Sequence, residues 1–165
     1  CFYDSLQRIS PDRRFFNNPA LQTLGDGEKM LLGELEYHKG SHETAFEHLR
    51  EAVERSDSLH YSEPWPWMHP PRHALGALLM EQGQHTEAEK VYREDLGLSD
   101  TVVRCAQHAN NVWALHGLVE CLTIRGEVEE SGKFRAMLDS AIARADFAVT
   151  SSCCCREKVR DPAVL

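Results

Sequence analysis

Three glycines, Gly40, Gly83 and Gly126, lie at equal intervals of 43 residues in this chain of 165. Similar residues recur around each of them in the same register. The leucines eight residues before them are Leu32, Leu75 and Leu118, and the small residues five after them are Ala45, Ala88 and Ser131. A constant period of this length indicates that one structural unit is repeated along the chain, which excludes most other folds.

Each unit is predicted to be a pair of antiparallel helices joined at the glycine. Glycine readily adopts the positive φ that ends a helix, so it suits the turn between the two. In the central unit, Leu75, Leu78 and Leu79 follow the i, i+3, i+4 spacing of one helix face rather than the alternation of a strand. A single pair cannot bury its apolar face alone, so neighbouring units are expected to stack.

At these positions the chain resembles the tetratricopeptide repeat family. That family's motif has Leu-Gly in the first helix, Gly at the turn, and Ala followed by a large residue in the second helix. The matching residues are Leu32-Gly33, Gly40, Ala45 and Leu49, then Leu75-Gly76, Gly83, Ala88 and Tyr92, while the third copy departs from the motif at Arg135. The resemblance covers roughly residues 27–148. It implies an all-α fold, a right-handed α-α superhelix of about three helix-turn-helix repeats.

The connections between units are predicted to be long, because the family repeat has only about 34 residues. The first contains the run Pro64-Trp65-Pro66-Trp67, which cannot be helical. A Pro/Trp-rich connection of this kind, together with a Cys-rich end, also resembles a subgroup of the family. We expect Trp65 and Trp67 to pack over the first unit, and Pro71 to begin the next helix.

Three segments are expected along the chain. Residues 1–26 form an N-terminal segment, the remnant of an upstream repeat, since a chain that begins at Cys1 is expected to be a piece of a longer protein. Within it, a short helix over 20–24 ends at Gly25-Asp26-Gly27. Residues 27–149 form the repeat domain, with helices predicted over 28–39, 41–55, 71–96 (broken at Gly83), 112–125 and 127–147 and a short one over 102–107. Residues 150–165 form a mobile Cys-rich tail.

Composition excludes several classes of partner. The net charge is −8 and no basic stripe is present, whereas nucleic-acid binding needs clustered Lys and Arg. No apolar run approaches the ~20 residues of a membrane span, so no membrane partner is expected. Without a secretory signal, a reducing compartment and a cytoplasmic location are predicted, in which Cys105 and Cys121 are buried apolar residues.

The resemblance places a peptide-binding groove along the first helix of each unit. The residues that would line it are Glu34, Tyr37 and His38, then His73, Met80 and Glu81, then Trp113, His116 and Glu120. This surface is acidic to neutral, which suits a basic or aromatic peptide. Because no catalytic motif is recognisable either, the sequence favours a non-enzymatic scaffold that binds a protein or peptide.

A metal-binding or redox-linked protein is the alternative interpretation. The consecutive Cys153, Cys154 and Cys155 offer thiolates, which are soft metal ligands. Cys153 and Cys155, together with the groove histidines His73 and His116, are the candidate metal ligands, and no other cofactor is predicted. Packed cysteines and hydrogen-bonded histidines explain the same residues without a metal. A purely structural end of a longer repeat protein is a third interpretation.

Overall fold

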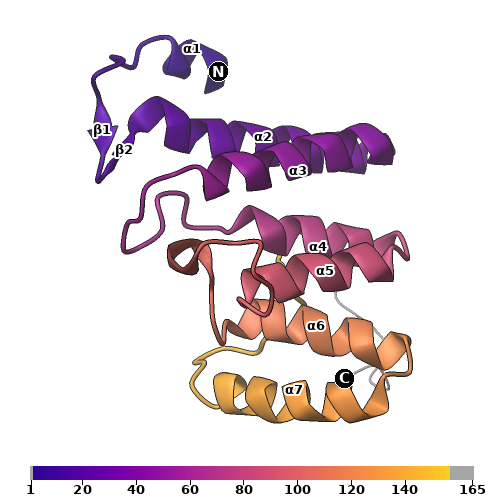
Figure 1. The fold of residues 1–165 in the computed structure, drawn as a ribbon. Helices are drawn as coiled ribbons and strands as arrows, with labels where there is room; N and C mark the ends of the chain where they lie inside the picture. Colours follow the sequence, from indigo (N-terminus) through magenta and orange to yellow (C-terminus); the bar gives the residue numbers. More distant parts are fainter. Residues whose placement is uncertain (1, 157–165) are drawn as a thin grey trace. The chain divides into compact units, whose positions relative to one another are not determined.

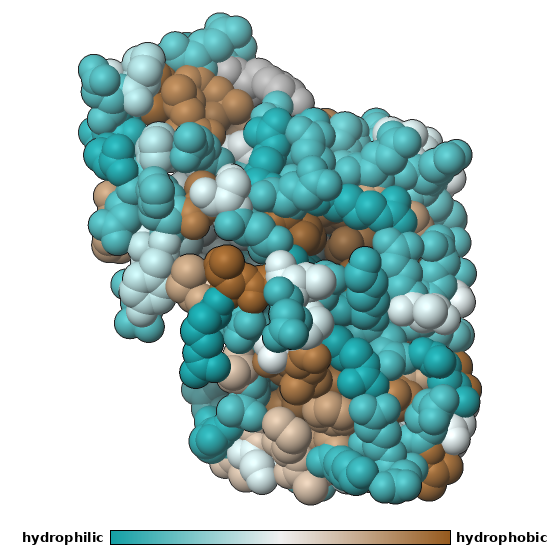
Figure 2. Space-filling view, viewed as in Figure 1, coloured by the Kyte–Doolittle hydropathy of each residue, from teal (hydrophilic) through white to brown (hydrophobic). Residues whose placement is uncertain are grey.

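The computed structural model describes residues 2–156, and these form seven α-helices that pack pairwise in sequence order (Figure 1). They divide into two compact units, Cys1–Pro71 and Arg72–Leu165, each described here by itself. No helix in the described part of the chain is long and apolar enough to cross a bilayer. On the face drawn in Figure 2 the surface is mainly hydrophilic, and apolar residues gather in small separate patches.

Unit 1 consists of a short N-terminal part and one helical hairpin. Its elements are α1 (Phe2–Leu6), β1 (Arg14–Phe15), β2 (Asn18–Pro19), α2 (Ala20–His38) and α3 (His42–Asp57). The two strands pair antiparallel. The buried Asn18 amide ties them to the segment after α3, since it donates to the His60 carbonyl at 2.8 Å and accepts from the His60 N–H at 2.7 Å.

Helix α2 begins at Ala20 and continues through Gly25-Asp26-Gly27, so the predicted break before residue 28 is wrong. The glycines serve close packing. A Cβ at Gly25 would lie 2.7 Å from Arg55 Nη1, and one at Gly27 would meet the ring of Trp67. Trp67 also donates its indole N–H to Met30 Sδ at 3.1 Å, which confirms that it packs over this unit, whereas Trp65 remains 37% exposed.

Unit 2 holds two further hairpins. Its elements are α4 (Pro71–Glu81), α5 (His85–Asp95), the short 3-10 helix η1 (Arg104–Ala106), α6 (Val112–Ile124) and α7 (Val128–Ile142). Pro71 begins α4 as predicted. The Asn111 side chain caps α6 by accepting from the Trp113 and Ala114 N–H groups. The helix predicted over 102–107 is only the turn of η1, and α7 ends at Ile142, before the predicted residue 147.

The three equally spaced glycines form the hairpin turns, as predicted. Gly40, Gly83 and Gly126 have φ values of +85°, +70° and +75°. After each of them the next residue's N–H returns to the carbonyl five residues earlier: Ser41 to Glu36, Gln84 to Leu79, and Glu127 to Leu122. This hydrogen bond and the left-handed glycine are the Schellman motif that ends a helix.

The core of unit 2 is arranged around Tyr92, a fully buried side chain of α5. A Cβ at Gly76 of α4 would lie 2.6 Å from Tyr92 Cζ, and one at Gly117 of α6 would lie even closer to the ring. The ring therefore lies between two helices that approach it closely because each has a glycine there. The same pairing of a small and a large residue recurs in unit 1, where a Cβ at Gly33 would lie 2.6 Å from Leu49 Cγ.

Gly117→Ala is expected to lower the free energy of unfolding by about 2 kcal/mol, because overpacking of a dense core typically costs about 1–3 kcal/mol. Gly132 of α7 is the matched control, since a Cβ there meets nothing within 4 Å. Gly132→Ala should instead raise stability by about 0.5–1 kcal/mol through helix propensity. Urea unfolding followed by circular dichroism measures both, and equal effects would contradict the packing role of Gly117.

Asp26 is a buried carboxyl in α2. Its exposure is 0%, and neither carboxylate oxygen has a hydrogen-bond partner among the described residues. Burial raises the pKa of Asp26 from 3.8 to about 7, which the positive charge of Arg55 offsets only in part, and the negative charge of Asp57 raises it further. The folded state thus holds a proton on Asp26 at mildly acidic pH, whereas the unfolded state releases it.

The stability of unit 1 is therefore expected to fall as pH rises from about 4 to about 7, because the folded state binds the extra proton over that range. Above pH 7 the shift corresponds to roughly 3 to 4 kcal/mol of lost stability. Asp26→Asn should remove this dependence and give the more stable protein at pH 8. Urea unfolding of both proteins at pH 5 and pH 8 measures it, and a parallel pH dependence would contradict the assignment.

Candidate functional site

The predicted groove residues are divided between the two units. In unit 1, Tyr37 is buried and its ring packs against that of His42, with centroids 4.7 Å apart. His38 is exposed, and Glu34 is half-buried. Burial raises the pKa of Glu34 and the neighbouring His38 lowers it, with burial the larger effect. These three side chains lie on α2, but only Glu34 and His38 are open to solvent.

In unit 2 most of the predicted groove residues are interior. The buried members are His73, Met80, His116 and Glu120, with exposures of 1–4%, whereas Trp113 is half-buried and Glu81 is exposed. Trp113 stacks on Phe147 with ring centroids 5.5 Å apart. Burial lowers the pKa of His116, and neither of its ring nitrogens has a hydrogen-bond partner among the described residues.

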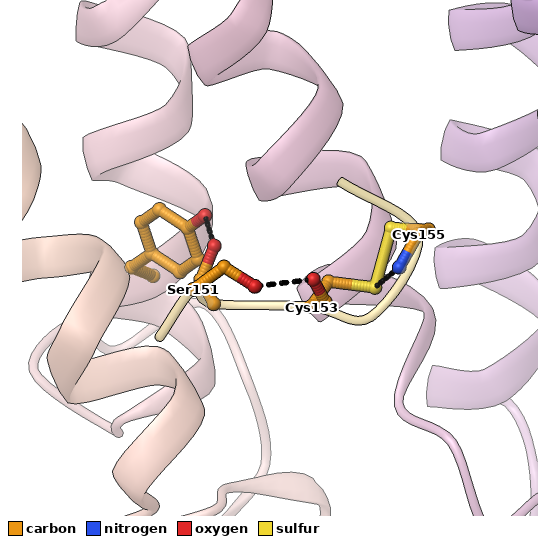
Figure 3. The surroundings of a disulfide bond; sticks show 5 residues. Ser151, Cys153 and Cys155 are labelled. Carbon is orange, nitrogen blue, oxygen red and sulfur yellow. Dashed lines mark hydrogen bonds between the residues drawn. A yellow bond between two sulfur atoms is a disulfide. The ribbon is translucent and has the colours of Figure 1, made fainter. Parts of the chain in front are cut away.

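Residues 151–156 pack against α5 and α6 of unit 2 (Figure 3). Ser151, Ser152 and Cys153 are buried, and the Ser152 hydroxyl lies 2.6 Å from the Tyr92 hydroxyl. Arg156 closes the segment, since its two terminal nitrogens each donate to a different oxygen of Glu120 at 2.7 Å. The prediction of a mobile tail is therefore wrong for residues 151–156, and residues 157–165 lie outside the described part of the chain.

The cysteines differ in their surroundings. Cys121 is buried as predicted, and burial raises its pKa to about 12, whereas Cys105 is exposed, so that prediction is wrong. Cys153 and Cys155 are joined in a disulfide (Figure 3). Cys154 is an exposed thiol. A disulfide offers no thiolate, so metal binding by Cys153 and Cys155 stays a prediction for the reduced chain.

His73 belongs to a cluster with two residues that were not predicted. Its Nε2 lies 3.0 Å from Asp95 Oδ2, and His108 Nδ1 lies 2.7 Å from Asp95 Oδ1. Burial raises the pKa of Asp95, but the hydrogen bonds with His108 and His73 outweigh it and lower the pKa to about 2. Asp95 is therefore an ionised carboxylate in the interior, and both imidazole nitrogens donate to it.

Of the two residues that were not predicted, only Asp95 had a signal in the sequence. Asp95 follows Val91 and Tyr92 by four and three residues, so it falls on the buried face of α5, where an acid needs a partner. Glu120 is likewise the only acidic residue of the otherwise apolar helix α6. Nothing local identifies the partners His108 and Arg156, because the first follows Asp95 by 13 residues and the second follows Glu120 by 36.

Unit 1 also contains a pocket of about 520 Å³. Its lining is mainly apolar and comes from β1, α2 and the Pro/Trp-rich connection: Phe15, Ala20, Thr23, Leu24, Pro66, Trp67, Met68 and His69. The Thr23 hydroxyl is buried and has no hydrogen-bond partner in the described structure. No pattern in the sequence indicated this pocket.

Comparison of the chain with protein-family models and with curated proteins gives no match. The resemblance to tetratricopeptide repeats therefore stays a prediction that rests on the repeated residues themselves.

Arg156→Ala is expected to lower the free energy of unfolding by about 3 kcal/mol, because it leaves the buried Glu120 charge without its partner. Adding Glu120→Gln should recover part of the loss, since the uncompensated charge disappears. Lys133→Ala is the control, because the ion pair of Lys133 with Glu129 is exposed and contributes little. Urea unfolding measures all three; equal effects of Arg156→Ala and Lys133→Ala would contradict the role of the buried pair.

Proposed function

We propose that this chain is a non-enzymatic protein-interaction scaffold, in which the face formed by α4, Tyr92 and α6 binds an extended peptide segment. One observation supports this above the others. Residues 151–156 already occupy that face, held by the Ser152 contact with Tyr92 and by the paired hydrogen bonds of Arg156 to Glu120.

The bound segment indicates which peptide the face would accept. A guanidinium is the natural partner of a buried carboxylate, because two parallel hydrogen bonds match the geometry of both groups. The Tyr92 hydroxyl favours a hydroxyl-bearing residue four positions before the arginine, as Ser152 is before Arg156. The proposed ligand is therefore a segment of small residues followed by arginine, in agreement with the basic peptide expected from the sequence.

The repeated residues support the same proposal. In the tetratricopeptide family, which this chain resembles, the first helices of the repeats form the peptide-binding groove. Here α4 and α6 are the first helices of their hairpins, and they carry His73, His116 and Glu120. A right-handed superhelical arrangement of the hairpins is part of this proposal.

The tail would act as an internal competitor for an external peptide. A short tether gives a bound segment an effective concentration in the millimolar range, so a free peptide must compete with it. Weakening the tail should therefore increase the affinity for a peptide that carries the same recognition residues.

The test uses a fluorescent peptide that copies residues 150–156 with serine in place of each cysteine. Arg156→Ala in the full chain should increase the peptide's affinity at least ~10-fold over the wild type, because the competing arginine is gone. Arg144→Ala is the matched control, since Arg144 is exposed and precedes the tail. Fluorescence anisotropy measures binding, and circular dichroism verifies folding.

Two further binding measurements test the contact between the arginine of the peptide and Glu120. A peptide with alanine in place of its arginine should not bind, and the chain that combines Arg156→Ala with Glu120→Gln should lose the gain in affinity. If the Arg156→Ala and Arg144→Ala chains bind the peptide equally weakly, the face does not accept a segment in trans and the proposal is wrong.

A further inference from the structure

Three potential metal ligands converge in unit 2, at His73, Asp95 and His108. Each offers one ligand atom, and these atoms all lie within 4.8 Å of one another. They come from three separate parts of the unit: α4, the last residue of α5, and the segment between η1 and α6. The His108 N–H also donates to the Asp95 carbonyl at 2.6 Å, which holds that segment against the end of α5.

We propose that this cluster binds one divalent first-row cation, foremost Zn²⁺, through His73 Nε2, an Asp95 carboxylate oxygen and His108 Nδ1. Two imidazoles and one carboxylate are a common protein ligand set for such ions. This site is distinct from the peptide face proposed above and from the predicted ligands Cys153 and Cys155. Among the predicted metal ligands, His73 is the one that also belongs to this site.

The geometry is close to what zinc requires. Bonds of about 2.1 Å in a tetrahedron place ligand atoms roughly 3.4 Å apart. The two nitrogen–oxygen distances are 3.0 and 2.7 Å in the hydrogen-bonded cluster. These two distances run to different oxygens of Asp95, and the three ligand atoms lie within 4.8 Å of one another. Separations of roughly 3.4 Å therefore require changes of at most about 1.4 Å, which rotation of the side chains supplies without rearrangement of the helices.

The charge of the cluster also favours a cation. Asp95 is fully buried, so a cation in contact with its carboxylate stabilises a charge that water does not reach. As the last residue of α5, it lies at the helix end where the backbone dipole attracts positive charge. A divalent ion at this point takes the place of the two hydrogen bonds to Asp95 and offsets its negative charge.

Ion binding requires both histidines to change tautomer. In the hydrogen-bonded cluster the protons lie on His73 Nε2 and His108 Nδ1, because the ionised Asp95 only accepts. In the metal-bound cluster these nitrogens coordinate the ion, so the protons move to His73 Nδ1 and His108 Nε2. The His108 side chain is 10% exposed against 3% for His73, so water reaches the fourth position from the His108 side.

The test is zinc titration of the full chain after chelator treatment, with stoichiometry from native mass spectrometry and affinity from competition with a chromophoric chelator. We expect one zinc ion per chain. His108→Gln keeps a hydrogen-bond donor for Asp95 but removes a good ligand, so it should fold normally. It should weaken zinc binding by more than the ~100-fold that loss of an outer-shell partner costs.

Two controls separate this site from the alternatives. His85→Ala, which removes a half-buried histidine of α5 outside the cluster, should leave zinc binding unchanged. The Cys153→Ser/Cys155→Ser chain should also bind normally, and cobalt(II) in place of zinc should show no thiolate charge-transfer band. The proposal is overturned if no stoichiometric zinc binds, if His108→Gln binds as the wild type does, or if only the cysteine variant loses the ion.

Discussion

The contact of Tyr92 with Gly76 and Gly117 is the constraint on which unit 2 depends. Both helices reach the ring only because neither glycine has a Cβ, so α4, α5 and α6 form one core. A buried tyrosine also needs a partner for its hydroxyl. Ser152 of the tail supplies this partner, with its hydroxyl oxygen 2.6 Å from that of Tyr92. The packing of one ring thus explains why the chain returns to this face after α7.

Buried charges explain the position of the segments outside the hairpins. Glu120 and Asp95 both lie on apolar helix faces, where an unpaired charge is costly. Arg156 from the tail compensates the first, and His108 from the segment after η1 donates to the second. Asp26 of α2 has no hydrogen-bond partner among the described residues, and at mildly acidic pH it holds a proton instead, because burial raises its pKa to about 7. Buried carboxyl groups are therefore stabilised in two ways: by partners from added segments in unit 2, and by protonation in unit 1.

The sequence predicted the hairpins well because their determinants are local. The turn glycines, Pro71 at the start of α4 and the Asn111 cap each act within a few residues of the backbone that they shape. The continuous α2 and the docked tail were not predicted, because both depend on distant partners. Gly25 and Gly27 resemble a break until Arg55 and Trp67 pack on them. His73 was selected as a site residue by register, but its partners Asp95 and His108 come from elsewhere in the fold.

Positions 43 residues apart in the chain differ in the contacts that they make. Met30, His73 and His116 occupy the same position of their units, 43 residues apart. Met30 accepts from Trp67, and His73 pairs with Asp95. His116 has no such partner, because the position equivalent to Asp95 in its unit is Leu138. The first helix of each hairpin thus supplies a side chain at the same position, and the residues around it decide what that side chain does. Met30 packs with Trp67, and His73 joins the Asp95 cluster. His116 is a buried imidazole with no hydrogen-bond partner among the described residues. The connections between the hairpins supply Trp67 and His108, so these connections carry much of what distinguishes one hairpin from the next.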